Sequence, residues 1–355
     1  MVRARSGGPI RWGRVLLFLL LVFSLTWGSM GLSALLSEGR GGVDPGLPPL
    51  GMYVPALVAL VFRRFFLQDS LLFFRAYRET PRWIIYGFFG LVGAQVGLTL
   101  LAYLSDLPLA ALRSASNWAM ILWTLLLIRL YKKYGGQSFR RAGLQLGNTN
   151  LGAVFVAAFA LYLALQSGLN LAFGLSTLTP PVDRILGFTV PGSLYPLALL
   201  LLFLLSAVGT PLGSLPLVFG EEYAWRGFLQ DELEALGRLP ASLFIGLIWG
   251  LWHIPVILSG IHTYPPTLTG IALGLVFFSL WGVVQSYAVF KVGSVWAAAF
   301  LHGVVNGVYA FFRTYVESPD DKVFSFGLGL YGILCLALVA LLILRDPVWR
   351  REGGG

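Results

Sequence analysis

Long apolar stretches recur along the whole chain and are separated by short segments that contain polar and charged residues. A transmembrane helix needs about 20 apolar residues, because a helix rises about 1.5 Å per residue and the hydrocarbon core of a bilayer is about 30 Å thick. The pattern predicts an all-α fold, a polytopic transmembrane helical bundle of about 8–10 spans. The ten candidate stretches lie at about residues 14–36, 47–66, 84–105, 114–131, 149–175, 193–220, 241–259, 266–290, 294–316 and 324–344.

The amino-acid composition agrees with a membrane protein. Hydrophobic residues make up 57% of the 355 positions and charged residues only 12%, a balance that excludes an ordinary soluble globular domain. The single cysteine, Cys335, excludes an internal disulfide and a cysteine-based metal site.

Basic residues are distributed unevenly between the two ends of the predicted spans. If the N-terminus lies in the cytoplasm and the ten spans alternate in direction, most of the 25 Lys and Arg residues fall in cytoplasmic segments. This bias follows the positive-inside rule and predicts a multi-pass protein of the cell membrane with both termini in the cytoplasm. The net charge of +9 is then explained by topology, so the lipid bilayer is a predicted partner and nucleic acid is not. The basic residues placed outside are Arg40, Arg113, Arg184, Arg313 and Lys322.

Two adjacent carboxylates and an arginine follow the sixth apolar stretch, in the sequence GEEYAWRGFL. A charged side chain at the bilayer centre costs about 2.5–3.5 kcal/mol on insertion scales, so such a cluster points to a functional site. Glu222 and Arg226 are four residues apart on a helix and are predicted to pair as structural support. Glu221 is rotated by about 100° from Glu222 and can face another direction.

Two histidines lie in the apolar stretches that follow. His253 occurs in WGLWHIP, four residues after Trp249, so the indole is predicted to form a wall beside the imidazole. His302 occurs in LHGVVNG, four residues before Asn306, so these two hydrogen-bonding groups share a helix face. The third histidine, His262, falls in a predicted loop and is left out of the candidate site.

The spacing of turns predicts that these groups meet at similar depth. Pro211 and Gly213 are expected to end the preceding helix, so that the helix carrying Glu221 begins near Leu215. Glu221 and His253 lie at similar distances on either side of a predicted cytoplasmic turn at residues 237–240. We therefore expect three helices to converge on one polar pocket that opens to the cytoplasmic side.

These residue types suit the hydrolysis of a peptide bond. A buried carboxylate can act as a general base towards water, and a histidine can orient that water or ligate a metal. A second histidine and an amide can donate hydrogen bonds to a developing oxyanion. No serine or cysteine is placed as an obvious nucleophile, so attack by water is the simpler mechanism.

Three motifs in this order resemble the type II CAAX prenyl endopeptidase and bacteriocin-processing family, also called the CPBP or Abi family of intramembrane proteases. The resemblance covers roughly residues 195–312, and one position departs from it, because Trp stands where the family has Phe. The motifs E-E-x-x-x-R, F-x-x-x-H and H-x-x-x-N correspond to Glu221, Glu222 and Arg226, to Trp249 and His253, and to His302 and Asn306.

The resemblance implies an integral-membrane endopeptidase, or hydrolase. By family analogy Glu221 and His253 activate the water, while His302 and Asn306 stabilise the oxyanion. Metal dependence is open: a zinc site would take Glu221, His253 and His302 as its three protein ligands, and a metal-free glutamate mechanism uses the same residues. We favour the metal-free mechanism.

The motifs divide the chain into three predicted parts. Residues 1–147 hold N-terminal spans to which no motif assigns a role. Residues 148–317 hold the CPBP/Abi-like catalytic helical core, and residues 318–355 hold the last span and a cytoplasmic tail.

Two other classes of function remain open. A proton-coupled transporter also places Glu and His within its spans, but the sequence shows neither repeated halves nor paired broken helices. A non-catalytic immunity or scaffold relative is the other alternative, although all four polar site residues are present. The predicted partner is a membrane-anchored protein or peptide; prenylated proteins, leader peptides, bacteriocins and membrane-anchored regulators all fit this description.

Overall fold

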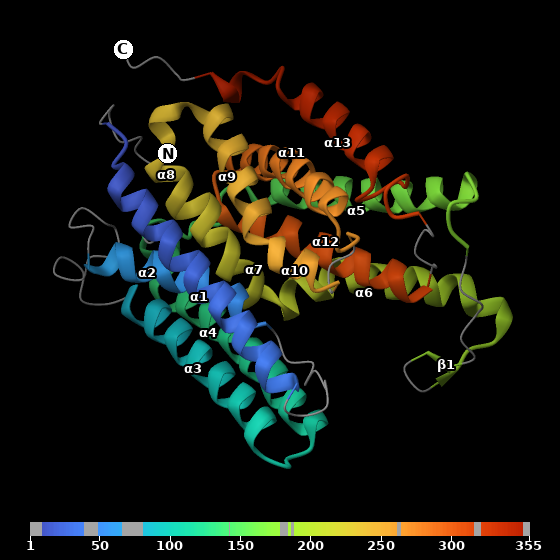
Figure 1. Cartoon of the computed structure of the whole chain (residues 1–355), viewed down its shortest axis with the longest axis horizontal. Coiled ribbons are helices and arrows are strands. Elements are labelled where there is room, and N and C mark those ends of the chain that lie inside the picture. Colours follow the sequence, from blue (N-terminus) through green and yellow to red (C-terminus); the bar gives the residue numbers. More distant parts are fainter. Residues whose placement is uncertain are drawn as a thin grey trace. The chain divides into compact units, whose positions relative to one another are not determined.

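A computed structural model describes residues 9–38, 49–65, 81–141, 143–177, 184–185, 188–260, 264–315 and 321–350. Helices dominate these residues (Figure 1), which confirms the predicted all-helical class. Within the described part of the chain, seven helices are long and apolar enough to cross a membrane. They are α1 (Trp12–Glu38), α3 (Pro81–Leu104), α4 (Leu109–Arg141), α5 (Thr149–Ala172), α6 (Tyr195–Gly213), α11 (Leu268–Val292) and α12 (Val295–Tyr315).

Three further apolar stretches form shorter helices: α2 (Val54–Phe65), α9 (Arg238–Trp252) and α13 (Leu330–Ile343). A helix of about 15 residues is only about 22 Å long, which is less than the hydrocarbon thickness. Every predicted stretch therefore contains an apolar helix, although three of them are too short to cross the bilayer unaided.

Short elements connect these helices. The segment after α6 comprises α7 (Leu215–Glu222), a π-helical segment η3 (Tyr223–Leu229) and α8 (Gln230–Glu232). A two-stranded antiparallel hairpin joins α5 to α6, with β1 (Arg184–Ile185) paired to β2 (Phe188–Thr189). The remaining short helices are η1 (Leu50–Tyr53), η2 (Gly192–Leu194), η4 (Glu234–Leu236), α10 (Ile254–Leu258) and η5 (Pro347–Trp349).

The chain forms two compact units that interleave in sequence. Unit 1 comprises residues 1–149, 213–237 and 289–299. Unit 2 comprises residues 150–212, 238–288 and 300–355. The three polar motifs are divided between them, because Glu221 belongs to unit 1 and both histidines of the candidate site belong to unit 2.

In unit 1, α3 and α4 lie side by side (Figure 1). Two hydrogen bonds join them inside the apolar surroundings: the Ser116 hydroxyl donates to the Gln95 side-chain Oε1 at 2.7 Å, and the Gln95 Nε2 donates to the Ser116 backbone carbonyl at 3.1 Å. A polar side chain within a membrane must find such a partner. Gln95 is therefore explained by helix packing.

In unit 2, glycines let helix backbones approach one another closely. A Cβ atom placed on Gly246 of α9 would lie 2.5 Å from the Phe278 carbonyl oxygen of α11, and one placed on Gly307 of α12 would lie 2.1 Å from the Ser206 carbonyl oxygen of α6. Membrane helices commonly associate through such small residues, because the hydrophobic effect does not drive helices together within lipid and close van der Waals packing does.

Large apolar side chains remain exposed on the outer surface of α6. A soluble monomer rarely exposes a continuous apolar patch of this kind, whereas a lipid-facing helix does. The exposed residues of α6 include Leu197, Leu201, Leu205 and Val208.

Candidate active site

The motif segment, which we define as residues 215–232, begins where the sequence predicted. Helix α6 ends at Gly213 and α7 begins at Leu215, with Pro216 in its first turn. The prediction assumed one continuous α-helix through the motif, but the structure changes to a π-helix directly after Glu222. Such π-helical turns are rare and occur frequently at functional sites.

The structure contains the predicted pair of Glu222 and Arg226. The Arg226 Nη1 atom lies 2.9 Å from the Glu222 Oε2 atom, and both side chains are 0% exposed. Charges buried to this extent depend on their partner, since removing one of them leaves the other uncompensated. This geometry suits a structural role.

Glu221 is buried as well, with 1% of its surface exposed. The aromatic rings of Phe219 and Tyr223 stack at 4.9 Å on the same segment, two residues before and two residues after it. Glu221 thus has an environment with little bulk water, in which electrostatic interactions are strong.

His253 lies at a break between two helices of unit 2. Helix α9 ends at Trp252 and α10 begins at Ile254, with Pro255 in its first turn. Proline lacks a backbone N–H, so it cannot continue the hydrogen bonding of α9. The His253 Nδ1 atom lies 2.8 Å from the Trp249 carbonyl oxygen. Because a carbonyl only accepts, Nδ1 carries the proton in this contact.

Trp249 contacts both imidazoles of the candidate site. Its ring centroid lies 5.5 Å from that of His253 and 5.3 Å from that of His302. Phe278 of α11 stacks on His253 at 4.2 Å, with an angle of 16° between the rings, and also contacts Trp249 at 4.8 Å. The predicted aromatic wall therefore exists, and Trp249 lies against both histidines.

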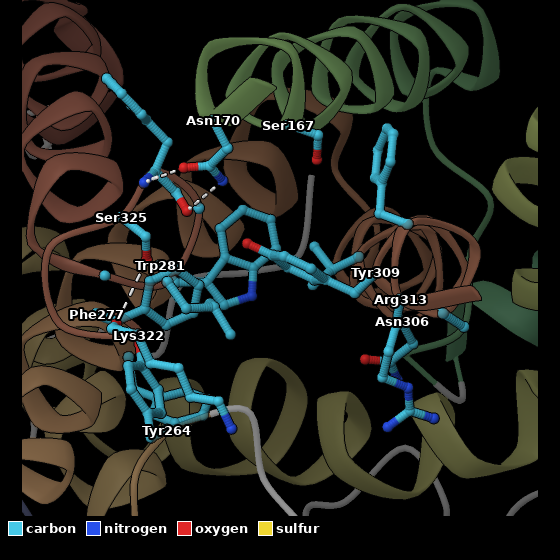
Figure 2. Close-up of a pocket in the computed structure, with 18 of the residues that line it drawn as sticks. Ser167, Asn170, Tyr264, Phe277, Trp281, Asn306, Tyr309, Arg313, Lys322 and Ser325 are labelled. Carbon is cyan, nitrogen blue, oxygen red and sulfur yellow. Dashed lines mark hydrogen bonds between the residues drawn. The ribbon is translucent and has the colours of Figure 1, made fainter. Parts of the chain in front are cut away.

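A cavity of about 350 Å³ in unit 2 is lined by Trp249, His253, His302 and Asn306. Four of the predicted site residues thus share one space. Its other walls combine aromatic residues, including Trp281 and Tyr309, which lie near the centre of the view in Figure 2, with several polar and charged residues. A cavity that combines apolar walls with placed polar groups is the usual form of a ligand site.

The cavity follows one face of α12. His302, Asn306, Tyr309 and Arg313 all line it and are spaced three or four residues apart, as expected for one side of a helix. At 1.5 Å per residue, the backbones of His302 and Arg313 are about 16 Å apart along the axis. Arg313 and Lys322 are exposed residues at this end of the cavity.

The loop after α12 is held in place by an amide of α5. Asn170 donates to the Phe326 carbonyl at 3.2 Å and accepts from the Phe326 N–H at 2.9 Å (Figure 2). One turn earlier on α5, the Gln166 side-chain oxygen accepts from the Gly327 N–H at 3.1 Å. The sequence alone assigned a role to neither Gln166 nor Asn170. Two amides four residues apart in an apolar helix were the available signal.

Two basic residues line one end of the cavity. Arg313 and Lys322 are among the few basic residues that the charge pattern places outside. The cavity therefore reaches the end of α12 that the charge pattern places outside, and the cytoplasmic opening stays a prediction. The orientation of the chain in the membrane stays a prediction.

No three His, Cys, Asp or Glu side chains form a metal-binding group among the residues that the structure describes. The lining of the cavity offers two imidazoles, His253 and His302. The third ligand of the zinc alternative, Glu221, belongs to unit 1. His262, which we left out of the site, lies outside the described residues.

Comparison with known proteins identifies the family of this region. Residues 193–308 match a family model, Rce1-like, described as type II CAAX prenyl endopeptidase Rce1-like. The matched range is about a third of the chain and contains all seven motif residues. No curated protein and no solved structure matched the chain significantly.

Proposed function

We propose that this multi-pass membrane protein hydrolyses a peptide bond of a membrane-associated protein or peptide. Residues 193–308 form an Rce1-like type II CAAX prenyl endopeptidase domain, and the proteases of this family act on proteins. The observation that carries the proposal is the cavity of unit 2, which brings together Trp249, His253, His302 and Asn306 within this domain. Glu221, a buried carboxylate of the same domain, is the proposed general base.

In this mechanism Glu221 removes a proton from a water molecule, whose oxygen forms a bond to the scissile carbonyl carbon. His253 accepts a hydrogen bond from that water through Nε2, since its Nδ1–H is directed to the Trp249 carbonyl. His302 and Asn306 each donate a hydrogen bond to the carbonyl oxygen as it becomes negative. The C–N bond then breaks, and the proton held by Glu221 passes to the leaving amine. No step requires a metal ion.

The walls of the cavity indicate the kind of substrate. Aromatic residues surround the two histidines, so apolar side chains next to the scissile bond would be bound best. A membrane-anchored protein or peptide fits this requirement, whether prenylated or not.

We also propose a catalytic core over residues 148–317. The cavity adds Lys322 and the loop that follows to this core, and residues 1–147 and 318–355 flank it.

The test compares membranes that contain wild-type protein with membranes that contain Glu221→Gln. N-terminal proteomics should find new termini only with the wild type, with apolar residues at the cleavage points. The purified wild type should then cleave a synthetic peptide that spans one of these points. Identical termini in the two samples, together with an uncleaved peptide, would contradict the proposed function.

A further inference from the structure

The N-terminal helices carry none of the three motifs, yet they pack directly on the segment that bears Glu221. Unit 1 contains α1, α2, α3 and α4 together with the motif segment. We propose that α1 and α2 are positioning elements of the active site, with Arg63, Arg14 and the contact at Gly220 fixing the depth and rotation of Glu221. This inference rests on the proposed function, because it assigns these residues a role in placing the general base.

The N-terminal part of the chain makes a close backbone contact with the motif segment immediately before Glu221. A Cβ atom placed on Gly220 would lie 2.3 Å from the carbonyl oxygen of Met52 and 3.1 Å from its carbonyl carbon. The backbone of η1 therefore touches the backbone of α7, and any side chain at position 220 would push the two apart. This contact sets how far α7 approaches η1, which leads directly into α2.

Aromatic contacts hold the segment on both sides of Glu221. Phe219 lies 5.3 Å from Phe88 of α3 and 5.2 Å from Trp123 of α4, measured between ring centroids. Further along, Phe228 lies 4.7 Å from Phe18 of α1. Buried ring pairs of this kind prefer defined geometries, so they resist sliding of one helix past another.

Arg63 of α2 contacts the motif segment at two places. Its guanidinium carbon lies 5.3 Å from the ring centroid of Tyr223, two residues after Glu221. Its Nη2 atom lies 3.1 Å from the Asp231 Oδ2 atom, beyond the end of the π-helical turn. One side chain thus bridges the start of the π-helical segment and the turn that follows it. Rotation of the segment would break one of these contacts.

A second arginine binds the neighbouring residue of the same turn. The Arg14 Nη1 atom of α1 lies 3.1 Å from the Glu232 Oε1 atom, and both side chains are largely buried, at 15% and 5% exposure. We call Asp231 and Glu232 the acidic turn. Two helices from the start of the chain therefore hold this turn, and through it the end of the π-helical segment.

Position matters because general-base catalysis depends on a near-attack geometry. A misplacement of about 1 Å by a change far from the chemistry can cost about 100-fold in rate. A π-helical turn is an uncommon conformation, so contacts outside the segment are needed to select it. Loosening the acidic turn should lower kcat, whereas substrate binding in the aromatic cavity should be kept.

The main test measures kcat and KM of Arg63→Met on the peptide of the previous section, using monodisperse protein. We expect kcat to fall about 10- to 100-fold with KM within about threefold of the wild type. Arg129→Met on α4 is the matched control, since Arg129 is exposed, and it should keep the wild-type kcat. For the ion pair of Arg14 and Glu232, Arg14→Glu should lower kcat. The double variant Arg14→Glu with Glu232→Arg, which exchanges the two charges, should restore kcat to at least half of the wild-type value.

A second pair of variants tests the contact at Gly220. Gly220→Ala should lower kcat to a similar extent, although alanine favours a helix more than glycine does. Gly227→Ala is the control within the same segment, because a Cβ atom there would meet its nearest neighbour at an ordinary 3.7 Å. It should retain most of the activity.

The outcomes separate the two proposals. If the wild type does not cleave the peptide, the proposed function fails. If the wild type cleaves it and Glu221→Gln does not, while Arg63→Met and Gly220→Ala both keep the wild-type kcat, the positioning role alone is wrong. The positioning role would also be overturned if these variants lost activity only because less protein folded, while kcat of the monodisperse fraction stayed at the wild-type value.

Discussion

The buried pair of Glu222 and Arg226 leads to a prediction about two adjacent glutamates. We expect Glu222→Gln to destabilise the fold and Glu221→Gln to abolish proteolysis without comparable loss of stability. The reason is that Glu222→Gln removes one partner of a 2.9 Å ion pair whose side chains are both fully buried. Glu221→Gln leaves that pair in place.

The size of the effect follows from the burial. Removing one partner of a buried ion pair typically costs about 3–5 kcal/mol, because the other charge stays in an apolar environment. Total stabilities of folded domains are about 5–15 kcal/mol. The loss would shift the folding equilibrium at least about 100-fold, since each 1.4 kcal/mol is a factor of about ten. Glu222→Gln should therefore keep only part of the wild-type stability.

The assay heats detergent-solubilised protein through a series of temperatures and measures the fraction that remains monodisperse by size-exclusion chromatography. Glu222→Gln should lose this fraction at clearly lower temperature than the wild type. The double variant Glu222→Gln with Arg226→Gln should recover part of the loss, because no unpaired charge remains. Glu221→Gln is the matched control and should follow the wild-type curve.

Two results would refute the reasoning. If Glu222→Gln were as stable as the wild type but inactive, and Glu221→Gln kept its activity, the roles of the two glutamates would be reversed. If the double variant were less stable than the single variant, the cost would not come from an unpaired Arg226.

Three further predictions concern the cavity and the membrane. His302→Ala and Asn306→Ala should each lower the rate about 10²–10³-fold, which is the usual effect of losing one oxyanion donor, and purified protein should contain no stoichiometric metal. If instead the protein holds one zinc per chain, His302→Ala loses that zinc and Asn306→Ala has only a mild effect, the site is a metal site. Asn170→Leu should raise KM more than it lowers kcat, since it frees the loop that lines the far end of the cavity; an unchanged KM would exclude that role. A reporter after Gly355 and a tag in the loop at 259–266 should report opposite sides of the membrane, and finding both on one side would break the predicted topology.

Local features of the structure could be predicted from the sequence. The start of α7 at Leu215 follows from Pro211 and Gly213, and the Glu222–Arg226 pair follows from a spacing of four residues. Each of these depends on residues close together in the chain. The contact of Trp249 with His253 belongs to the same class.

Long-range features could not be predicted. The π-helical segment after Glu222 and the acidic turn contact α1 and α2, more than 150 residues earlier in the chain. The far wall of the cavity depends on Asn170 and Phe326, which are 156 residues apart. A single sequence carries no signal for such pairs, because both partners look ordinary in their own segments.

The two units also differ in how dissolved ions should act on them. The acidic turn of unit 1 is held in part by the Arg63–Asp231 ion pair, which reaches the surface because the Asp231 side chain is 58% exposed, whereas the Arg14–Glu232 pair is largely buried. The Debye length falls from about 8 Å at physiological ionic strength to about 3 Å in 1 M salt, which weakens such pairs. The close backbone contacts at Gly246 and Gly307 carry no net charge and are unaffected by screening. Concentrated salt would thus loosen the segment that bears Glu221 while the cavity keeps its shape, and turnover would slow reversibly at constant substrate affinity.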